Sequence, residues 1–307
     1  MAECLECNLC DNPGTFAGAT DVASIPCHVD CFRNDHFTVW RCTNCGSLHS
    51  KEEVDLLHYY DRYPFKNHRL DFHTRVGYAN RIRLLERFGL KKTDRILDFG
   101  CGAGLFLQVL RSAGYTNVFG FDSFVQQFND PGIFSQTFDA VVSYDVIEHV
   151  DSPREFLNML VGRVRPGGLM VLGTPNADHI PLQYRTFPAM ELSQPYHRHI
   201  LSGRVLFELA REHSLEVQHT LRRFYFDSLI PTVNTRYMWS YINATGGMID
   251  VCVQPMQKSV MFRSPRLLFE AFFGYFFPPR GNILVTFRRP LSEKLSGEEP
   301  RRRAGNE

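Results

Sequence analysis

The stretch Asp98-Phe99-Gly100-Cys101-Gly102-Ala103-Gly104 lies between a short apolar run, Ile96-Leu97, and an amphipathic segment that begins at Leu105. Its glycines allow the backbone to turn tightly from a strand into a helix, and they let a ligand approach the helix N-terminus with no Cβ in the way. An ordinary strand-to-helix turn can carry the same pattern. Whether the loop binds a ligand must therefore be inferred from the residues on either side of it.

Short apolar runs alternate with amphipathic segments on both sides of this loop. We expect strands at 96–99, 118–122, 140–143, 169–172, 215–221 and 282–287, and helices over 105–112, from Pro153 to Pro166-Gly167-Gly168, and from Ser202. This alternation is typical of βαβ units and a mostly parallel sheet, so the predicted fold class is α/β. Asp122 closes the second strand, where a carboxylate can accept hydrogen bonds from ribose hydroxyls.

Further segments extend the pattern: Asp98-x-Gly-x-Gly-x-Gly104, Gly120-Phe-Asp122, Phe138-Asp139-Ala-Val-Val, Ile147-Glu148-His149-Val150 and Arg165-Pro-Gly-Gly168. In this order and spacing they resemble the class I S-adenosylmethionine-dependent methyltransferases, over residues 70–224 and 282–289. The resemblance implies a Rossmann-like fold with a mostly parallel, seven-stranded-type sheet. Because the span from Asp122 to Asp139 is short, the third strand of that sheet is expected to be short or absent.

The same resemblance implies S-adenosylmethionine as the cofactor and assigns residues to it. The glycine loop would hold the methionine part, the acidic residue after the second strand the ribose, and the segment after the strand at 140–143 would line the methyl-transfer cleft. The implied cofactor-binding residues are Asp98, Gly100, Cys101, Gly102, Gly104, Asp122, Ser143, Tyr144 and Asp145.

Acidic and histidine side chains follow the strand at 140–143. Asp145, Glu148 and His149 resemble the acidic, Glu-His segment of the ubiquinone-biosynthesis O-methyltransferases, which implies a divalent cation at these residues. The cation or His149 would then help to deprotonate a catechol-like hydroxyl. Alternatively, the Glu-His pair only caps the strand and packs against the cofactor. Further candidates for the expected cleft are His197 and His199, either of which could be the general base, and the turn Thr174-Pro175-Asn176.

Cysteines are concentrated at the N-terminus, where the first 45 residues hold all of them except Cys101 and Cys252. Two Cys-x2-Cys knuckles, Cys7 with Cys10 and Cys42 with Cys45, can each direct two thiolates toward one tetrahedral zinc. The segment resembles the cysteine ribbon ahead of the methyltransferase domain in some bacterial sugar and natural-product methyltransferases. Cys4 and the Cys27-His28-x2-Cys31 segment leave the exact ligand set and a second zinc open.

The chain divides into a zinc ribbon (1–50), a connector with a leading helix (51–92), the methyltransferase domain (93–290) and a disordered tail (291–307). An aromatic-rich insertion, 225–281, is expected to form a lid over the acceptor pocket. Within it, residues 267–277 are aromatic on nearly every side but too few to span a bilayer. This segment would lie in a membrane interface or cover a lipidic substrate, or it would be buried in the core or in a dimer interface.

The charges nearly balance, with 34 Lys and Arg against 33 Asp and Glu, which argues against a globally basic nucleic-acid binder. The sequence shows no run of about 18 uncharged apolar residues, and Glu3 and Glu6 follow Met1 where a secretory signal would be basic and then apolar. We therefore expect a cytoplasmic methyltransferase, with membrane association left open. Its acceptor would be a hydroxyl or amine of a small molecule such as a sugar, a quinone, a lipid-like compound or a natural-product intermediate. The alternative is that the ribbon recognises RNA or protein and directs modification or binding to them. The sequence leaves the oligomeric state open.

Overall fold

The computed structural model describes residues 3–67, 69–184 and 187–291 of the chain, so the predicted tail from 292 onwards lies outside the described residues. The strands are β1 (Val22–Pro26), β2 (His36–Arg41), β3 (Leu48–Ser50), β4 (Ile96–Phe99), β5 (Val118–Phe121), β6 (Phe138–Tyr144), β7 (Val164–Pro175), β8 (His199–Ile200), β9 (Glu216–Leu221) and β10 (Asn282–Arg288). The helices are α1 (Leu56–Asp61), α2 (Phe72–Arg87), α3 (Leu105–Ser112), α4 (Pro153–Arg163), α5 (Gly203–Glu212), α6 (Thr235–Ala244), α7 (Lys258–Arg263) and α8 (Pro265–Phe273).

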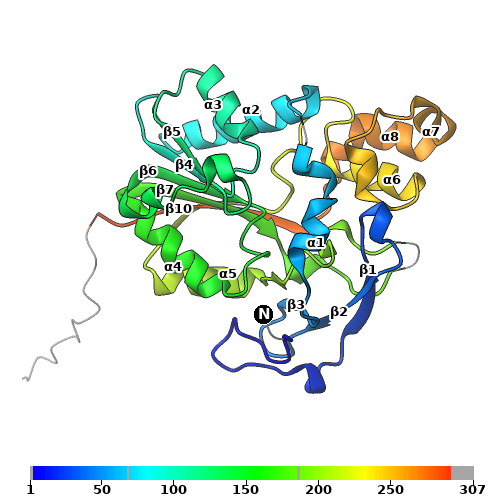
Figure 1. Ribbon diagram of the computed structural model, residues 1–307. Coiled ribbons are helices and arrows are strands. Elements are labelled where there is room, and N and C mark those ends of the chain that lie inside the picture. The colour runs from blue at the N-terminus through cyan, green and yellow to red at the C-terminus, as the bar shows by residue number, and fades with distance from the viewer. Residues whose placement is uncertain (1–2, 68, 185–186, 292–307) are drawn as a thin grey trace, which may run out of the picture.

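Six strands form the central sheet in the order β5-β4-β6-β7-β10-β9 (Figure 1). β4 to β7 are mutually parallel, and β10 is antiparallel to both of its neighbours, β7 and β9. Between β5 and β6 the structure forms two 3-10 helices, Gln126–Phe128 and Pro131–Ser135, and no strand. The Rossmann-like, mostly parallel sheet is confirmed, and the short span after Asp122 leaves β5 at the sheet edge.

The strand predicted at 169–172 is longer than expected. The preceding helix ends at Arg163 and β7 begins at once at Val164, so Pro166 and Gly167 lie inside the strand rather than in a turn before it. The register between β6 and β7 shifts from Phe138–Val164 to Ala140–Leu169. A proline, which has no N–H to donate, is tolerated in a strand at such an irregularity.

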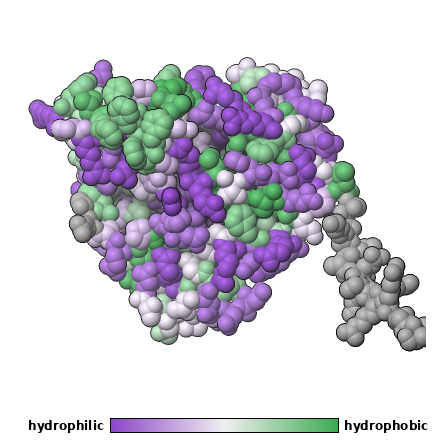
Figure 2. All heavy atoms as spheres, turned by 180° about the vertical axis from the view of Figure 1, so that it is seen from behind, coloured by the Kyte–Doolittle hydropathy of each residue, from purple (hydrophilic) through white to green (hydrophobic). Residues whose placement is uncertain are grey.

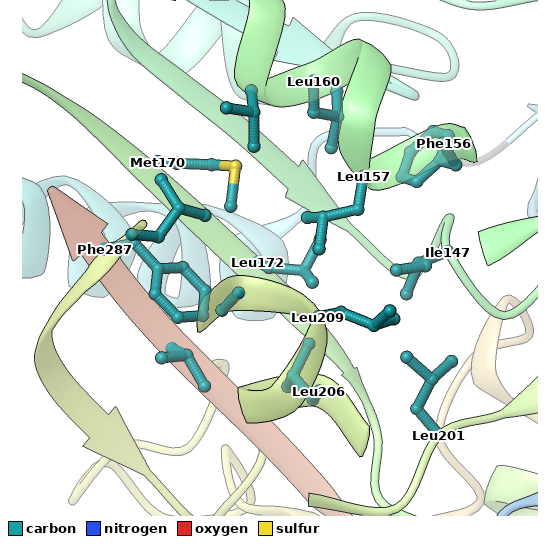
Figure 3. Close-up of a cluster of buried hydrophobic side chains, with 14 of the residues drawn as sticks. Ile147, Phe156, Leu157, Leu160, Met170, Leu172, Leu201, Leu206, Leu209 and Phe287 are labelled. Atoms are coloured by element: carbon teal, nitrogen blue, oxygen red, sulfur yellow. The ribbon is translucent and has the colours of Figure 1, made fainter. Parts of the chain in front are cut away.

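Two apolar cores cover the two faces of the sheet. Figure 3 shows one of them, in which Leu157 and Leu160 of α4 and Leu209 of α5 pack near Met170 and Leu172 of β7. On the opposite face, α2 and α3 pack against the residues of β7 that alternate with these, because successive side chains of a strand point to opposite faces. The sheet is therefore fixed from both sides, and the loops at its ends carry the site.

The N-terminal segment forms a second sheet in the order β1-β2-β3-β8. Its fourth strand, β8, comes from the second half of the chain and pairs antiparallel with β3, with His49 opposite His199 and Leu48 opposite Ile200. The sequence division at residue 50 therefore does not separate two independent sheets.

The insertion between β9 and β10 folds into α6, α7 and α8 (Figure 1). Tyr237 and Tyr241 of α6 form a small core with Leu267 and Ala271 of α8. In the described parts of the chain, no helix combines the length and the apolar character needed to cross a bilayer.

Candidate active site

A cavity of about 1950 Å³ opens beyond the carboxyl ends of β4, β5 and β6. In an open α/β sheet this is the position where ligands bind. The cavity is lined by the glycine loop, by α2 and by α6. Of the predicted cofactor residues, Asp98, Gly100, Cys101, Gly102, Asp122, Tyr144 and Asp145 line it, whereas Gly104 and Ser143 do not.

The glycine loop needs its glycines for different reasons. Gly100 has a φ of 81°, and a Cβ there would overlap the side chain of Val146. Gly102 has a φ of 51° and open space where its Cβ would be, so the backbone itself faces the cavity. Gly104, at a φ of 73°, is the N-cap of α3. Left-handed conformations of this kind are costly for residues with a side chain.

Asp122 and Asp98 bring two carboxyl groups to the loop. One oxygen of Asp122 accepts a hydrogen bond from the Gly102 N–H at 2.9 Å and the other from the Phe124 N–H at 2.9 Å. Each carboxylate oxygen can accept a further bond, so Asp122 remains able to bind hydroxyls. Burial raises the pKa of Asp98 to about 7, while the nearby Arg81 lowers it and Asp122 raises it.

Arg81, on α2, is a cavity residue that the sequence analysis missed. It is buried, and its guanidinium lies 3.9 Å from the ring centre of Tyr144, 4.2 Å from that of Tyr225 and 4.4 Å from that of Phe226. Within the described chain no carboxylate forms an ion pair with it, and its Nε has no hydrogen-bond partner. The sequence did hold a signal for Arg81: the helical period of α2 places this charged residue on the buried side of the helix.

Asp145 does not join the predicted cation group. It has a φ of 54°, and its carboxylate accepts a hydrogen bond from the hydroxyl of Tyr225. The metal-ligating atoms of Glu148, His149 and His197 instead lie within 4.8 Å of one another. The prediction of Asp145 as the third member of this group is therefore corrected to His197, because the backbone N–H groups of Arg198 and His199 donate to the Glu148 carbonyl and so hold this segment beside the Glu-His pair.

Hydrogen bonds to backbone carbonyls fix the tautomer of His149 and of His197. Nδ1 of His149 lies 2.9 Å from the carbonyl oxygen of Tyr196, and Nδ1 of His197 bonds the carbonyl oxygen of Glu191 at 2.6 Å. A carbonyl only accepts, so each neutral ring carries its proton on Nδ1 and a lone pair on Nε2. Burial lowers the pKa of His149 to about 4 and that of His197 still more strongly, which keeps both rings neutral.

Glu148 is fully buried beside these rings. One carboxyl oxygen accepts a hydrogen bond from the Thr174 hydroxyl at 3.0 Å, and Oε1 has no protein partner. Burial raises the pKa of Glu148 well above its usual value. One orphaned carboxyl oxygen and two imidazole lone pairs form a two-histidine, one-carboxylate donor set that fits a divalent cation. Of the turn candidates, Thr174 positions Glu148, Pro175 lines the cavity, and Asn176 caps a short 3-10 helix.

The predicted zinc ligands come together in the N-terminal sheet. The sulfur atoms of Cys7, Cys10, Cys42 and Cys45 all lie within 4.8 Å of one another, with Cys7 3.6 Å from Cys45 and 3.7 Å from Cys10. Tetrahedral zinc with Zn–S bonds of about 2.3 Å places its sulfurs about 3.8 Å apart, so the cluster fits one zinc ion. The hydrogen bond with Cys7, and also His49, lower the pKa of Cys45 to about 3.

His49 also connects this cluster to β8. Its Nδ1 lies 2.9 Å from Nδ1 of His199, and Nε2 of His199 is 3.4 Å from the side-chain amide of Asn8. Cys4 lies within 4.8 Å of both histidines. His199 is therefore a contact of the cysteine module rather than a cavity residue. Cys27, His28 and Cys31 join no group of three metal-ligating side chains among the described residues.

The insertion forms part of the cavity wall, but it does so with α6 and not with the aromatic segment 267–277. Tyr237, Trp239 and Tyr241 of α6 and Met256 line the cavity, whereas no residue of 265–277 does. The aromatic run 267–277 therefore lies behind the wall and not over the pocket.

Comparison with known proteins finds relatives for the central part of the chain. The family described as "Methyltransferase domain" matches residues 72–220. A mitochondrial ubiquinone biosynthesis O-methyltransferase of Dictyostelium discoideum is 32% identical over 112 residues, which are 26% of this chain and 35% of that protein. The corresponding enzyme of Rickettsia typhi is 29% identical over 133 residues, 36% of this chain and 51% of its own length.

A tRNA U34 carboxymethyltransferase of Pseudoalteromonas translucida is 34% identical over 113 residues, 30% of this chain and 35% of that protein. The chain thus spans between a third and about half of the length of these curated relatives. Among solved structures, an S-adenosylmethionine-dependent methyltransferase from Mesorhizobium loti aligns with a TM-score of 0.43 at 16% identity, covering 70% of this chain and 100% of that one. The match over 72–220 includes the glycine loop and strands β4 to β7, whereas β10 lies beyond it, so this part of the chain is similar to methyltransferase domains.

Proposed function

We propose that this protein is an S-adenosylmethionine-dependent methyltransferase that methylates a hydroxyl of an apolar small molecule. The observation that carries the proposal is that the glycine loop at Gly100–Gly102 and the imidazoles of His149 and His197 line the same cavity. A cofactor held at the loop and an acceptor held at the histidines would therefore share one enclosed space.

Four groups on the cavity wall suit the cofactor. The backbone at Gly102 would approach its methionine part, and Asp122 would accept hydrogen bonds from the ribose. Arg81 is a buried cation without an ion-pair partner in the described chain, which suits the cofactor carboxylate. Asp98, which burial keeps partly protonated near neutral pH, would become a carboxylate opposite the cofactor ammonium.

The transfer itself is an in-line displacement. A bound S-adenosylmethionine would supply the methyl group: the bond from the methyl carbon to the sulfonium sulfur would break with its electron pair on sulfur, a carbon–oxygen bond would form, and a neutral thioether would leave. The acceptor hydroxyl must lose its proton. Without a bound cation, Nε2 of His149 or of His197 would take it, because Nδ1 of each ring is bonded to a carbonyl. A cation held by both rings would occupy these lone pairs and acidify the hydroxyl instead, so that the proton would pass to solvent.

Glu148, His149 and His197 would hold a divalent cation next to this reaction. Bound there, the cation would polarise the acceptor oxygen and lower the pKa of its hydroxyl. Thr174 and the carbonyls of Tyr196 and Glu191 fix the orientation of the three donors. A catechol-like acceptor suits this set, because its second oxygen can also reach the cation, and the aromatic side chains of the wall suit an apolar ring.

The four-cysteine cluster is proposed to hold one structural zinc, because four thiolates leave no position open for water. Its contribution would be to stabilise the N-terminal sheet, in which β8 positions the segment that carries His197.

A methyl-transfer screen tests the proposal. Purified protein would be incubated with tritiated S-adenosylmethionine and lysate fractions split into small molecules, protein and RNA, and also with catechols, sugars and amines. We expect transfer to the small-molecule fraction and to catechols, reduced by chelation and restored by added divalent cation. His197→Ala should lower this rate by about 100- to 10,000-fold, whereas His179→Ala, at the exposed end of a short 3-10 helix, should not change it. Transfer to RNA or protein alone would contradict the proposed acceptor class.

A further inference from the structure

An unusual apolar surface lies on α7, α8 and the turn that follows. Phe262, Leu268, Phe269, Phe272, Phe273, Phe276 and Phe277 are each between 38% and 67% exposed, and we call them the phenylalanine face. In Figure 2 hydrophobic side chains gather at the upper left, where α7 and α8 lie after the half-turn from Figure 1. Single exposed apolar residues are ordinary, but a contiguous set of aromatic rings marks an interaction site.

The pattern of burial along α8 is inverted with respect to an ordinary surface helix. Its inner side uses Leu267, Glu270 and Ala271, which pack toward α6, and Gly274 follows on the same side. On the opposite side Leu268 and Phe269 are followed one helical turn later by Phe272 and Phe273, all exposed. A buried core helix is therefore excluded for this segment within the single chain, and its apolar side is turned outward.

Basic residues flank this face in the sequence. Lys258, Arg263 and Arg280 are exposed and form no ion pair with any described residue. The acidic residue of α8, Glu270, is buried and neutralised by Arg236 at 3.2 Å and Arg266 at 3.0 Å. A short helix with aromatic rings on one side and cations beside them is typical of a segment that lies in the interface of an anionic membrane.

We infer that the phenylalanine face docks on the surface of an anionic lipid bilayer. A second copy of this chain fits the face less well, because a symmetric contact would bring the unpaired cations of the two copies close together. The face also backs directly onto the cavity. Tyr237 and Tyr241 line the cavity on one side and contact the inner side of α8 on the other. Docking would therefore place the cavity wall next to the bilayer.

Vesicle flotation tests this inference without reference to activity. Wild-type protein would be mixed with vesicles of phosphatidylcholine alone or with 30% phosphatidylserine (about a third anionic lipid, comparable with a cytoplasmic leaflet). We expect it to float with the anionic vesicles and to be released by high salt. Phe272→Glu with Phe276→Glu should reduce the floated fraction at least about tenfold, because charged groups would enter the apolar interface. Arg263→Gln with Arg280→Gln should weaken binding by about fivefold for each cation removed.

The matched control is Val217→Glu with Leu291→Glu, which adds the same two charges at exposed apolar positions away from the face. It should float nearly as the wild type does. Equal thermal melting of all variants shows that they are folded. If wild type stays unbound with both vesicle types, or if the control loses binding as much as the phenylalanine variant, the inference is wrong. Sedimentation showing a dimer that Phe272→Glu with Phe276→Glu dissociates, without lipid binding by wild type, would assign the face to a second copy instead.

Discussion

Arg81 is a buried cation held by the faces of aromatic rings rather than by a carboxylate. Contacts of this kind stabilise a guanidinium only in part, and its N–H groups still require acceptors. The group is therefore prepared for an anion that enters the cavity. In this account that anion is the carboxylate of S-adenosylmethionine.

Replacing Arg81 by Gln should weaken the binding of S-adenosylmethionine by about 10- to 150-fold, because charge-assisted hydrogen bonds are worth about 1.5–3 kcal/mol. Adenosine, which has no carboxylate, should lose little affinity. Arg83→Gln is the matched control, since Arg83 lies on the same helix but is exposed. Calorimetry with both ligands measures the effect, and an equal loss for adenosine would show that Arg81 acts on the fold of the wall instead.

The carboxyl of Asp98 predicts a pH dependence of cofactor binding. Its pKa is raised to about 7 by burial in the free protein, and a cationic ligand must lower it. Below about pH 7 binding therefore releases a proton, so affinity should rise with pH up to about 7 and level off above it. Titration calorimetry between about pH 5.5 and 8.5 should show this slope for wild type and not for Asp98→Asn. A flat wild-type profile would contradict the assignment.

At the scale of elements, the pairing of β3 with β8 joins the cysteine module to the catalytic half of the chain. His49 faces His199 in that pairing, and His197 lies two residues earlier. A change at the cysteine cluster should therefore alter the order of the segment that forms the proposed cation site.

One zinc ion per chain is expected by elemental analysis, and Cys42→Ser with Cys45→Ser should abolish it. Because the proposed zinc would hold the knuckles that precede β3, its loss should also increase amide hydrogen exchange over residues 194–200. Cys31→Ser, outside the cluster, should retain the zinc and the protection. Retention of zinc in the double variant would refute the four-cysteine site.

Some helices and strands could be predicted from the sequence and others could not. The glycine loop and α3 were predictable because their signals are local: glycines, caps and helical period. The extension of β7 over Pro166 was not, because it depends on an irregular register with β6. The outward side of α8 was hidden as well, since a run that is aromatic all round gives no period from which to infer a buried side.

For the molecule as a whole, the sequence identified the parts but not how distant parts meet. Cys7, Cys10, Cys42 and Cys45 were predicted as one cluster because paired knuckles imply a shared metal. That His197 rather than Asp145 joins Glu148 and His149 could not be predicted, because it depends on backbone hydrogen bonds from residues 198 and 199 to Glu148, about 50 positions earlier in the chain. Arg81 was missed for a similar reason, since its ring contacts come from its own helix and from three other segments of the chain.

The central claim is that this cavity binds S-adenosylmethionine, and direct titration of the cofactor into the purified protein by calorimetry is the most direct test. We expect one binding site for S-adenosylmethionine per chain. We also expect a loss of affinity on the order of 100-fold or more for Asp122→Ala, which removes two hydrogen bonds to a charged acceptor. Asp130→Ala, in the exposed loop nearby, should bind as wild type does. No binding by wild type, or unchanged affinity of Asp122→Ala, would contradict the account.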